Sequence, residues 1–272
     1  MLLQKAYLSL ISKPKKKAVI VVPIYKKEIA DYEKTSLLQC IRILGKSYPI
    51  TFITYKSLDL SQYKSIIPKE LVVNFTFFEE SYFNDIRGYN ELMLSANFYS
   101  CFLEYEYILI HQLDAFVFKD ELSYWCNKNY DYVGAPWINP GWHEEALNYI
   151  YITTGLLKKS KQKIKEYKKN NSLMVGNGGF SLRKVKSFYL ISLSLRKKLR
   201  KWEKNEDVFW SIVAPVKFPF FKIPNISTAR AFAFEMNPQE QYLLNKMNLP
   251  FGCHGFTKYD IDFWKPFIQI SE

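Results

Sequence analysis

Cysteine is scarce in this sequence, and none is placed for a metal site or a disulfide framework. The four residues, Cys40, Cys101, Cys126 and Cys253, are scattered through 272 residues without a Cys-x-x-Cys pair. This spacing argues against a zinc-finger or zinc-ribbon site. Most of the cysteines sit in apolar stretches, as buried free thiols do, and such usage fits a reducing compartment.

Long hydrophobic runs are also missing. No stretch approaches the ~18 apolar residues that a membrane-spanning helix needs. The start, MLLQKAYLSLISKPKKK, has a short apolar part, no small-residue cleavage site, and lysines after the apolar run, so it does not read as a secretory signal. We expect either a first helix or arm docked on the domain, or a short amphipathic helix at a membrane surface. Internal repeats and recognised nucleic-acid-binding motifs are absent as well.

Positive charge and aromatic residues are abundant. The chain has 38 Lys and Arg against 26 Asp and Glu, a formal net charge of +12, and 17% aromatic residues. A basic surface favours anionic partners such as nucleic acid, acidic lipid headgroups or phosphorylated substrates, although lysine-rich usage in an AT-rich genome has the same effect. Aromatic side chains suit sugar stacking, and equally an ordinary core. Composition alone leaves these alternatives open.

The first half of the sequence alternates strand and helix patterns. Ala18–Tyr25 is a continuous β-branched run, typical of a buried parallel strand. A helix face follows at i, i+3, i+4, i+7 and ends near Gly45. The pattern predicts further strands at 50–55, 72–78 and 107–118, with a buried helix at 89–104. This alternation predicts a parallel α/β sheet in one domain.

The second half is less regular. We predict strands at 130–137 and from Ser227 to Glu235, a basic helix ending near Lys201, a helix opening at Asn205, and a short helix at 237–247. Between Ile138 and Leu173 the pattern blurs into a lysine-rich run. That run is either a solvated helix or loop, or a mobile segment over an active site.

Candidate binding residues lie where predicted strands end, because ligands of open α/β sheets bind at the carboxyl ends of strands. Pro23, Ile24 and Tyr25 end the first strand, where a nucleotide base could stack. Asp85 and Asn90 could bind sugar or ribose hydroxyls, and the planar guanidinium of Arg87 suits phosphate. The alternative for residues 23–25 is a plain strand exit, and that for residues 85–90 is a capping turn with an exposed salt bridge.

Asp114 is the most informative acid, because it interrupts the apolar run 107–118, where an unpaired carboxylate would be costly. With Gln112 beside it, we expect Asp114 to bind a hydrogen-bond donor or a divalent cation bridging to a diphosphate. Asn177, Gly178 and Gly179 form a turn that lets backbone approach a ligand closely. The alternatives are a strand-closing cap and a simple tight turn.

Two further sites complete the candidates. Glu206 and Asp207 open a predicted helix, where acids are favourable, and either could instead act as a general base on an acceptor hydroxyl. His254 lies between two glycines in a late loop and could ligate a metal or bind phosphate, although a lone histidine is more often structural.

The ordered set of motifs VVPIY, ILIHQLDAFVF, YDYVGAPW, VGNGGFSLR, EDVFWS, AFAFE and PFGCHGF, spanning about Ala18 to Phe256, resembles a family of bacterial glycosyltransferases with the GT-A fold, often found near surface-polysaccharide genes. The most specific part is VGNGGFSLR followed by EDVFWS. The resemblance implies a mostly parallel central sheet flanked by helices, with a Rossmann-like nucleotide-binding half. One domain over 1–272 would then divide into a nucleotide-sugar-binding half at 18–118 and an acceptor and catalytic half at 130–256.

The resemblance also implies roles for the candidates. The Asp-x-Asp metal motif falls on Gln112-Leu-Asp114, so the first acid is replaced by glutamine, and metal-independent transfer stays open. His254 matches a late histidine that completes the Mn²⁺ or Mg²⁺ and diphosphate site. Asn177, Gly178 and Gly179 match a segment lining the donor sugar and acceptor. Asp207 matches the base of inverting enzymes, with Glu206 its acceptor-binding neighbour.

The remaining candidates fall in the nucleotide-binding half of the family pattern. Pro23, Ile24 and Tyr25 match the base-binding strand, and Asp85, Arg87 and Asn90 the region gripping the nucleotide and donor.

We therefore expect a hexosyltransferase that moves a sugar from a nucleotide-sugar donor, with UDP favoured by the family, to a glycan or lipid-linked acceptor with inversion. A cytoplasmic location, with peripheral contact at the inner face of the membrane, would follow from the basic surface. The alternative is a basic module binding nucleic acid or glycan without catalysis. That alternative does not account for the acid at Asp114 or the Gly-Gly and Glu-Asp pairs, and we expect no specific nucleic-acid partner.

Overall fold

The computed structural model describes residues 14, 16–137 and 175–270. The lysine-rich run between Ile138 and Leu173, for which we predicted a solvated helix or loop or a mobile segment, lies outside the described residues. In the first half the elements are β1 (Lys16–Pro23), α2 (Asp31–Leu44), β2 (Ile50–Thr54), α3 (Ser61–Ile66), β3 (Val73–Phe77), η1 (Glu80–Tyr82), α4 (Ile86–Met93), α5 (Ala96–Ser100) and β4 (Tyr105–His111).

The second half contains shorter elements. They are β5 (Ala115–Val117), α6 (Leu122–Asn127), β6 (Tyr132–Val133), β7 (Phe180–Lys184), α9 (Val185–Ser194), α10 (Arg196–Leu199), α11 (Glu206–Val208), the π-helix η2 (Phe209–Val213), α12 (Ala214–Lys217), α13 (Ile226–Phe232), β8 (Ala233–Phe234), α14 (Pro238–Leu244), β9 (Gly252–His254) and α15 (Ile261–Trp264). Among the described residues, no helix is long and apolar enough to cross a membrane.

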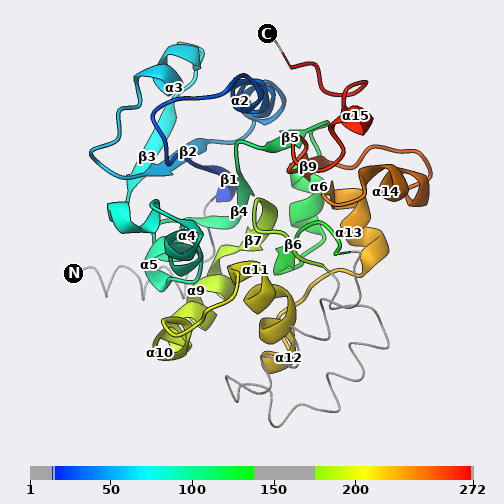
Figure 1. The fold of residues 1–272 in the computed structure, drawn as a ribbon. Helices are drawn as coiled ribbons and strands as arrows, with labels where there is room; N and C mark the ends of the chain where they lie inside the picture. The colour runs from blue at the N-terminus through cyan, green and yellow to red at the C-terminus, as the bar shows by residue number, and fades with distance from the viewer. Residues whose placement is uncertain (1–13, 15, 138–174, 271–272) are drawn as a thin grey trace.

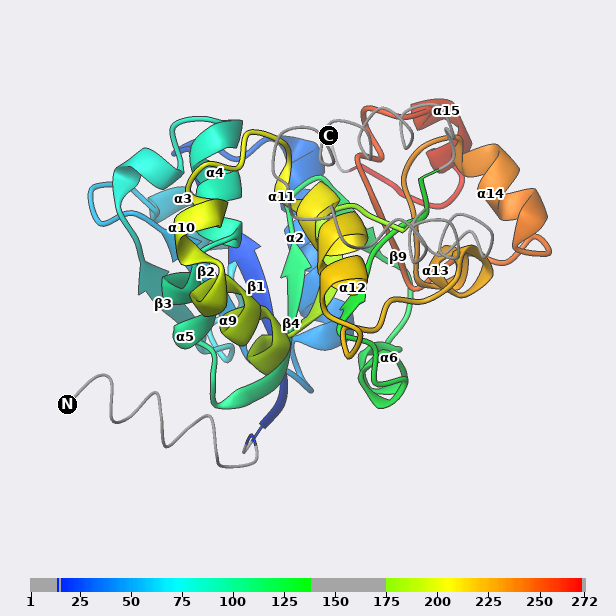
Figure 2. The ribbon, with the colours of Figure 1, turned by 90° about the horizontal axis from the view of Figure 1, so that it is seen from below.

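A six-stranded sheet in the order β3-β2-β1-β4-β7-β6 forms the centre of the molecule. The first four strands are parallel to their neighbours, whereas β7 runs antiparallel to β4 and to β6. Helices cover both faces, with α2 on one and α5 and α9 on the other (Figures 1 and 2). The predicted mostly parallel sheet flanked by helices is confirmed.

The apolar run of β1 is continuous because both of its faces are buried. Val19 and Val21 pack into the cluster that contains α5 and α9 side chains. Ile20 and Val22 pack into the opposite cluster, against α2. A parallel strand covered on both faces has no solvent side, so the alternation of polar and apolar residues disappears.

A second, three-stranded sheet of order β5-β9-β8 lies beside the first. The prediction of one strand over 107–118 is therefore wrong: the chain turns at Gln112–Asp114 and enters the other sheet. The strand predicted from Ser227 to Glu235 is also wrong over most of its length. Asn225 caps a helix there by accepting a hydrogen bond from the Thr228 amide, and only β8 remains extended.

The helix predicted over 89–104 is two helices, because Ser95 caps α5 by accepting a hydrogen bond from the Phe98 amide at 3.1 Å. The helix predicted to open at Asn205 is confirmed, as α11, η2 and α12 follow one another without a break. These helices lie beside β4 (Figure 2). Glu206 at the start of α11 approaches Gly178, next to Gly179, whose carbonyl accepts the Gln112 amide at the end of β4.

Candidate active site

The carboxyl end of β4 is where the two sheets and the glycine turn meet. β7 starts opposite the end of β4, with His111 paired to Phe180, and the Gln112 amide donates to the Gly179 carbonyl at 2.8 Å. β9 pairs Ala115 with His254, and the Gly255 amide donates to the Asp114 carbonyl at 2.9 Å. Three segments distant in sequence are thus fixed to one another by backbone hydrogen bonds.

His254 forms the centre of a charged cluster at this junction. Its Nε2 lies 3.1 Å from Asp114 Oδ1 and 3.1 Å from Gln112 Oε1, and its Nδ1 lies 3.0 Å from Glu235 Oε1. We call Gln112, Asp114, Glu235 and His254 the histidine cluster. The side chain of Asp114 is 36% exposed, whereas those of His254 and Glu235 are 15% and 14% exposed. The cluster is therefore open to a ligand on the Asp114 side.

The charges of the histidine cluster stabilise one another. Burial lowers the pKa of His254, but the Asp114 and Glu235 carboxylates outweigh it and raise the pKa to about 10. Burial raises the pKa of Asp114, but His254 outweighs that effect and holds the pKa below its ordinary value. The two carboxylates therefore favour the protonated form of the imidazole.

Gly178 and Gly179 separate the histidine cluster from Glu206 and Asp207, which we call the acid pair. A Cβ atom on Gly179 would lie 2.0 Å from His254 Nε2, and one on Gly178 would lie 2.2 Å from Glu206 Oε1. Asn177 makes this approach possible, because it adopts φ 77° and its Oδ1 accepts the Gly179 amide at 2.8 Å. The two glycines are needed for space on both sides of the turn.

Glu206 and Asp207 have different surroundings although they are adjacent. Both oxygens of buried Glu206 accept hydrogen bonds from Arg183, at 2.7 and 3.0 Å. Asp207 is half-buried, and one of its oxygens accepts the Val208 amide at 2.8 Å. Burial, together with the carboxylates of Glu206 and Glu235, raises the pKa of Asp207 to about 7.

Of the three residues predicted to grip the nucleotide and donor, only Asn90 contacts the acid pair. Asn90 reaches the acid pair, since its Oδ1 accepts the Glu206 amide at 3.0 Å. Asp85 caps α4 by accepting the Gly88 amide, and Arg87 is exposed on the same helix and pairs with Glu91. Asp85 and Arg87 thus make local contacts, whereas Asn90 links α4 to α11.

The predicted base-binding residues follow β1 at the same edge of the sheet. Pro23 ends β1, Ile24 is buried, and the Tyr25 side chain is exposed beyond it. Burial and the nearby Glu33 carboxylate raise the pKa of Tyr25, and Asp114 contributes to the same rise. Tyr25 therefore lies near enough to Asp114 to feel its charge.

Two residues of the site escaped prediction. Glu235 ends the motif AFAFE, which carried no assignment, although an acid directly after an apolar strand is the same signal that identified Asp114. Arg183 ends the motif NGGFSLR and is completely buried. A basic residue in an apolar strand requires a buried acid as partner, but the sequence does not say which one.

Known structures share this arrangement of elements at low sequence identity. The galactosyltransferase LgtC, solved with donor and acceptor sugar analogs, matches with a TM-score of 0.50 and 12% identity over 86% of this chain and 86% of its own. The bifunctional glycosyltransferase WbbM matches with a TM-score of 0.50 and 12% identity over 88% of this chain and 45% of its own. The likeness shows that this chain has the GT-A glycosyltransferase fold.

The mannosyltransferase Ktr4p from S. cerevisiae, solved in complex with GDP, overlaps more loosely, with a TM-score of 0.47 and 15% identity over 84% of this chain and 77% of its own. No curated protein matches the sequence. A family model does match, over residues 72–254, which include β4, the glycine turn, the acid pair and His254. The chain belongs to the family described as "Protein of unknown function (DUF5672)".

Proposed function

We propose that this protein is a glycosyltransferase that moves a sugar from a nucleotide-sugar donor to a glycan or lipid-linked acceptor. The observation that carries the proposal is the junction at the carboxyl end of β4. There the histidine cluster and the acid pair lie on either side of Gly178 and Gly179. In this proposal a site for a diphosphate and a site for a general base lie on opposite sides of the glycine turn.

Asp207 is the proposed general base. In an inverting transfer it takes the proton from the acceptor hydroxyl as that oxygen attacks the anomeric carbon, and the nucleoside diphosphate leaves. A pKa of about 7 makes Asp207 a stronger base than an ordinary aspartate while leaving much of it ionised at neutral pH. Glu206, whose carboxylate is held by Arg183 and whose amide donates to Asn90, positions the start of α11 and thereby Asp207.

The histidine cluster fits a divalent cation in part. Asp114 Oδ1 and His254 Nε2 are 3.1 Å apart, close to the ~3 Å between neighbouring ligands of an octahedral ion with bonds of ~2.1 Å. Glu235 can hold the proton on Nδ1 and leave Nε2 free, as in carboxylate–histidine–metal arrangements. The described residues contain no group of three acidic, histidine or cysteine side chains that could hold a metal by themselves. A bound Mn²⁺ or Mg²⁺ would neutralise the leaving diphosphate, whose oxygens would complete its coordination.

The donor lies, in this proposal, between β1 and the histidine cluster. The exposed ring of Tyr25, after Pro23 and Ile24, offers a face on which a nucleotide base stacks, and UDP is the nucleotide we favour. In this proposal Asn177, Gly178 and Gly179 line the donor sugar through their backbone, since closely packed His254 and Glu206 leave no space for a side chain at either glycine. Asp85 and Arg87 would contact the donor only at the rim, given their local contacts in α4.

A donor-hydrolysis screen tests the proposal. Purified protein is mixed with UDP-, GDP-, CMP- and dTDP-sugars in the presence of Mn²⁺, Mg²⁺ or EDTA, and the released nucleotide is measured. We expect release from one donor, lost in Asp207→Asn and in Asp114→Ala. The control is Asp262→Asn on the exposed helix α15. Failure of calorimetry to detect any nucleotide binding would remove the catalytic proposal and favour a binding module.

The proposal also predicts a pH dependence. Because the base must be deprotonated, kcat/KM should rise through pH 7 to a plateau, and the apparent pKa should be about 7. The charged groups around Asp207 are Glu206 and Glu235, which raise its pKa, and Arg183, which opposes them. Glu235→Gln should therefore shift the midpoint to lower pH. A profile without a rise between pH 6 and 8 would assign the base elsewhere.

A further inference from the structure

A ridge of basic side chains follows α9 and leads to the acid pair. Arg196, Lys197, Lys198, Arg200 and Lys201 are all exposed, and we call them the basic ridge. None of the five forms an ion pair with a described residue. Elsewhere many surface lysines do so, for example Lys16 with Glu104 and Lys17 with Glu106. The ridge is therefore a concentration of charge without internal compensation, and it stands out from the general positive charge of the chain.

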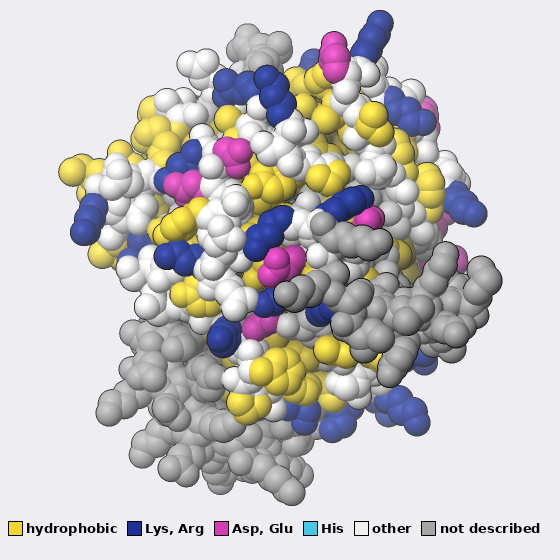
Figure 3. All heavy atoms as spheres, turned by 180° about the vertical axis from the view of Figure 1, so that it is seen from behind, with side chains coloured by type: hydrophobic (Ala, Val, Ile, Leu, Met, Phe, Trp, Pro, Cys, Tyr) yellow, Lys and Arg dark blue, Asp and Glu magenta, His cyan; other side chains and the backbone are white. Residues whose placement is uncertain are grey.

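Two exposed leucines lie directly before the basic ridge. Leu190 is 45% exposed and Leu193 is 47% exposed, although both belong to a helix whose other face is buried in the core. They are three residues apart on α9, and the basic ridge begins directly after the break at Leu195 that separates α9 from α10. On the back of the molecule, hydrophobic and basic side chains lie next to one another over much of the surface (Figure 3).

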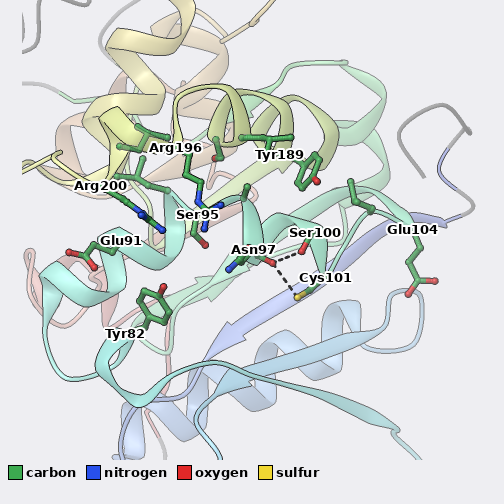
Figure 4. A pocket seen from close by; sticks show the side chains of 16 residues that line it. Tyr82, Glu91, Ser95, Asn97, Ser100, Cys101, Glu104, Tyr189, Arg196 and Arg200 are labelled. Carbon is green, nitrogen blue, oxygen red and sulfur yellow. Dashed lines mark hydrogen bonds between the residues drawn. The ribbon is translucent and has the colours of Figure 1, made fainter. Parts of the chain in front are cut away.

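A groove of about 1280 Å³ opens beside the leucines, between α4–α5 and α9–α10. Arg196 and Arg200 enter it from one wall, opposite Ser95 and Asn97 (Figure 4). The two acids that line it already have basic partners, since Glu91 pairs with Arg87 and Glu104 pairs with Lys16. The arginines have no carboxylate partner among the described residues, so the groove presents free guanidinium groups.

We propose that the basic ridge, Leu190, Leu193 and this groove together form a docking surface for an anionic lipid bilayer. Guanidinium groups bind phosphate through paired N–H donors, and Arg196 and Arg200 are placed to take headgroup phosphates in the groove. The leucines enter the interfacial region of the bilayer, and the lysines add attraction to the surface charge. A single-stranded nucleic acid would instead require exposed aromatic rings for base stacking. The basic ridge carries none, and of the tyrosines that line the groove Tyr189 is buried and Tyr82 only partly exposed.

This docking does not rest on the proposed function, because it uses none of the cleft residues. The basic ridge is nevertheless close in sequence to Glu206 and Asp207. α10 ends at Leu199 and α11 begins at Glu206, and the Asn90 side chain donates to Asn205 at 3.4 Å between them. The segment between the basic ridge and Glu206 is therefore short and is tied to α4 at Asn90.

Sedimentation of the full chain with vesicles tests the proposal. At physiological salt we expect binding to phosphatidylcholine vesicles containing 30% phosphatidylglycerol and little binding to pure phosphatidylcholine. Lys197→Glu, Lys198→Glu and Lys201→Glu in combination should weaken binding about 100-fold. The matched control combines Lys46→Glu, Lys56→Glu and Lys69→Glu, which removes the same charge from exposed positions elsewhere and should weaken binding far less.

A second variant separates lipid insertion from charge. Leu190→Ser with Leu193→Ser leaves the net charge unchanged and should weaken vesicle binding about tenfold, with an unaltered circular dichroism spectrum. Equal losses in the ridge variant and its lysine control would overturn the proposal, because bulk charge would then be the cause. So would a ridge variant that keeps vesicle binding but loses binding to mixed-sequence DNA, which would identify a nucleic-acid surface.

Discussion

Two charged groups lie on either side of the glycine turn, the Arg183–Glu206 pair and the histidine cluster, and they differ in how many of their hydrogen-bonding atoms have partners. Arg183 donates to both oxygens of Glu206, to the Gly178 carbonyl and to the hydroxyls of Tyr99 and Ser181. In the histidine cluster, by contrast, Asp114 keeps much of its surface open to solvent. The first group is closed and leaves nothing for a ligand to bind. The second has unused acceptor capacity, and it is where a ligand can gain free energy.

The difference assigns the two groups different tasks. A buried ion pair whose hydrogen bonds are all made fixes geometry, because any displacement leaves a charge uncompensated. A cluster that is exposed at Asp114 can exchange the partner of that carboxylate for a substrate group or a cation. We therefore expect substitutions in the Arg183–Glu206 pair to reduce stability, and those in the histidine cluster to reduce binding and activity.

The largest expected effect on stability is that of Arg183→Met. It leaves the Glu206 carboxylate buried without a partner, and the free energy of unfolding should fall by about 3–5 kcal/mol. Urea unfolding followed by circular dichroism measures the loss. The double variant Arg183→Met with Glu206→Leu removes both charges and should recover most of it. A double variant as unstable as the single one would show that packing, and not the pair, is what Arg183 contributes.

Asp207→Asn should have the next largest effect, and it should stabilise the protein at alkaline pH. The folded-state pKa of about 7 lies above the unfolded value of 3.8. Between these values the native state binds more protons than the unfolded state, so stability falls as pH rises from 4 to 7. Removing the charge should make the variant more stable than the parent by about 3 kcal/mol at pH 8, with little difference at pH 4.

The control for this prediction is Asp262→Asn, on a side chain that is 81% exposed. It should change stability by less than about 0.5 kcal/mol at either pH. Thermal unfolding of the three proteins at pH 4 and pH 8 provides the comparison. If Asp207→Asn gave the same difference from the parent at both pH values, Asp207 would not have the raised pKa on which its role as base depends.

Alanine substitutions at Gly178 and Gly179 compare the rigidity of the Arg183–Glu206 pair with that of the histidine cluster. An added Cβ would meet Glu206 Oε1 at 2.2 Å in Gly178→Ala and His254 Nε2 at 2.0 Å in Gly179→Ala. Glu206 cannot move without breaking its bonds to Arg183, so Gly178→Ala should cost about 3 kcal/mol. His254 can rotate toward the exposed side, so Gly179→Ala should cost about 1 kcal/mol and lose nucleotide-sugar hydrolysis. Chemical unfolding measures the free energy of unfolding of both variants. A larger loss in Gly179→Ala than in Gly178→Ala would contradict the idea that the Arg183–Glu206 pair is the more rigid group.

The sequence predicted the parts of the site that carry a local signal. Asp114 was identifiable because an acid in an apolar run is costly without a partner, and the glycine pair because few other residues permit close approach. Arg183 and Glu235 carry similar signals, but their partners lie 23 and 19 residues away in sequence. Which acid meets which base depends on the β4–β7 and β5–β9 registers, and these are set by tertiary packing.

The same limit explains the errors in the fold. In the run 107–118 the polar residues Gln112 and Asp114 interrupt the apolar pattern, but nothing in the sequence showed that the chain turns there and enters a second sheet. In residues 227–235 the alternation of alanine and phenylalanine favoured a strand, yet the Asn225 cap and several helix-tolerant residues produce α13. Each error concerns a short element whose neighbours decide its conformation.

The smallest expected effect on stability is that of Glu235→Gln, which keeps an oxygen to accept from His254 Nδ1 but removes the charge. Unfolding should change by less than about 1 kcal/mol. Mn²⁺ binding, measured by electron paramagnetic resonance in the presence of a nucleoside diphosphate and without any sugar donor, should weaken about tenfold, because the imidazole loses the carboxylate that raises its basicity. Glu235→Ala should weaken it further. If both variants bound Mn²⁺ as tightly as the parent, His254 would not be a metal ligand, and the open cluster would act on the donor through its imidazolium alone.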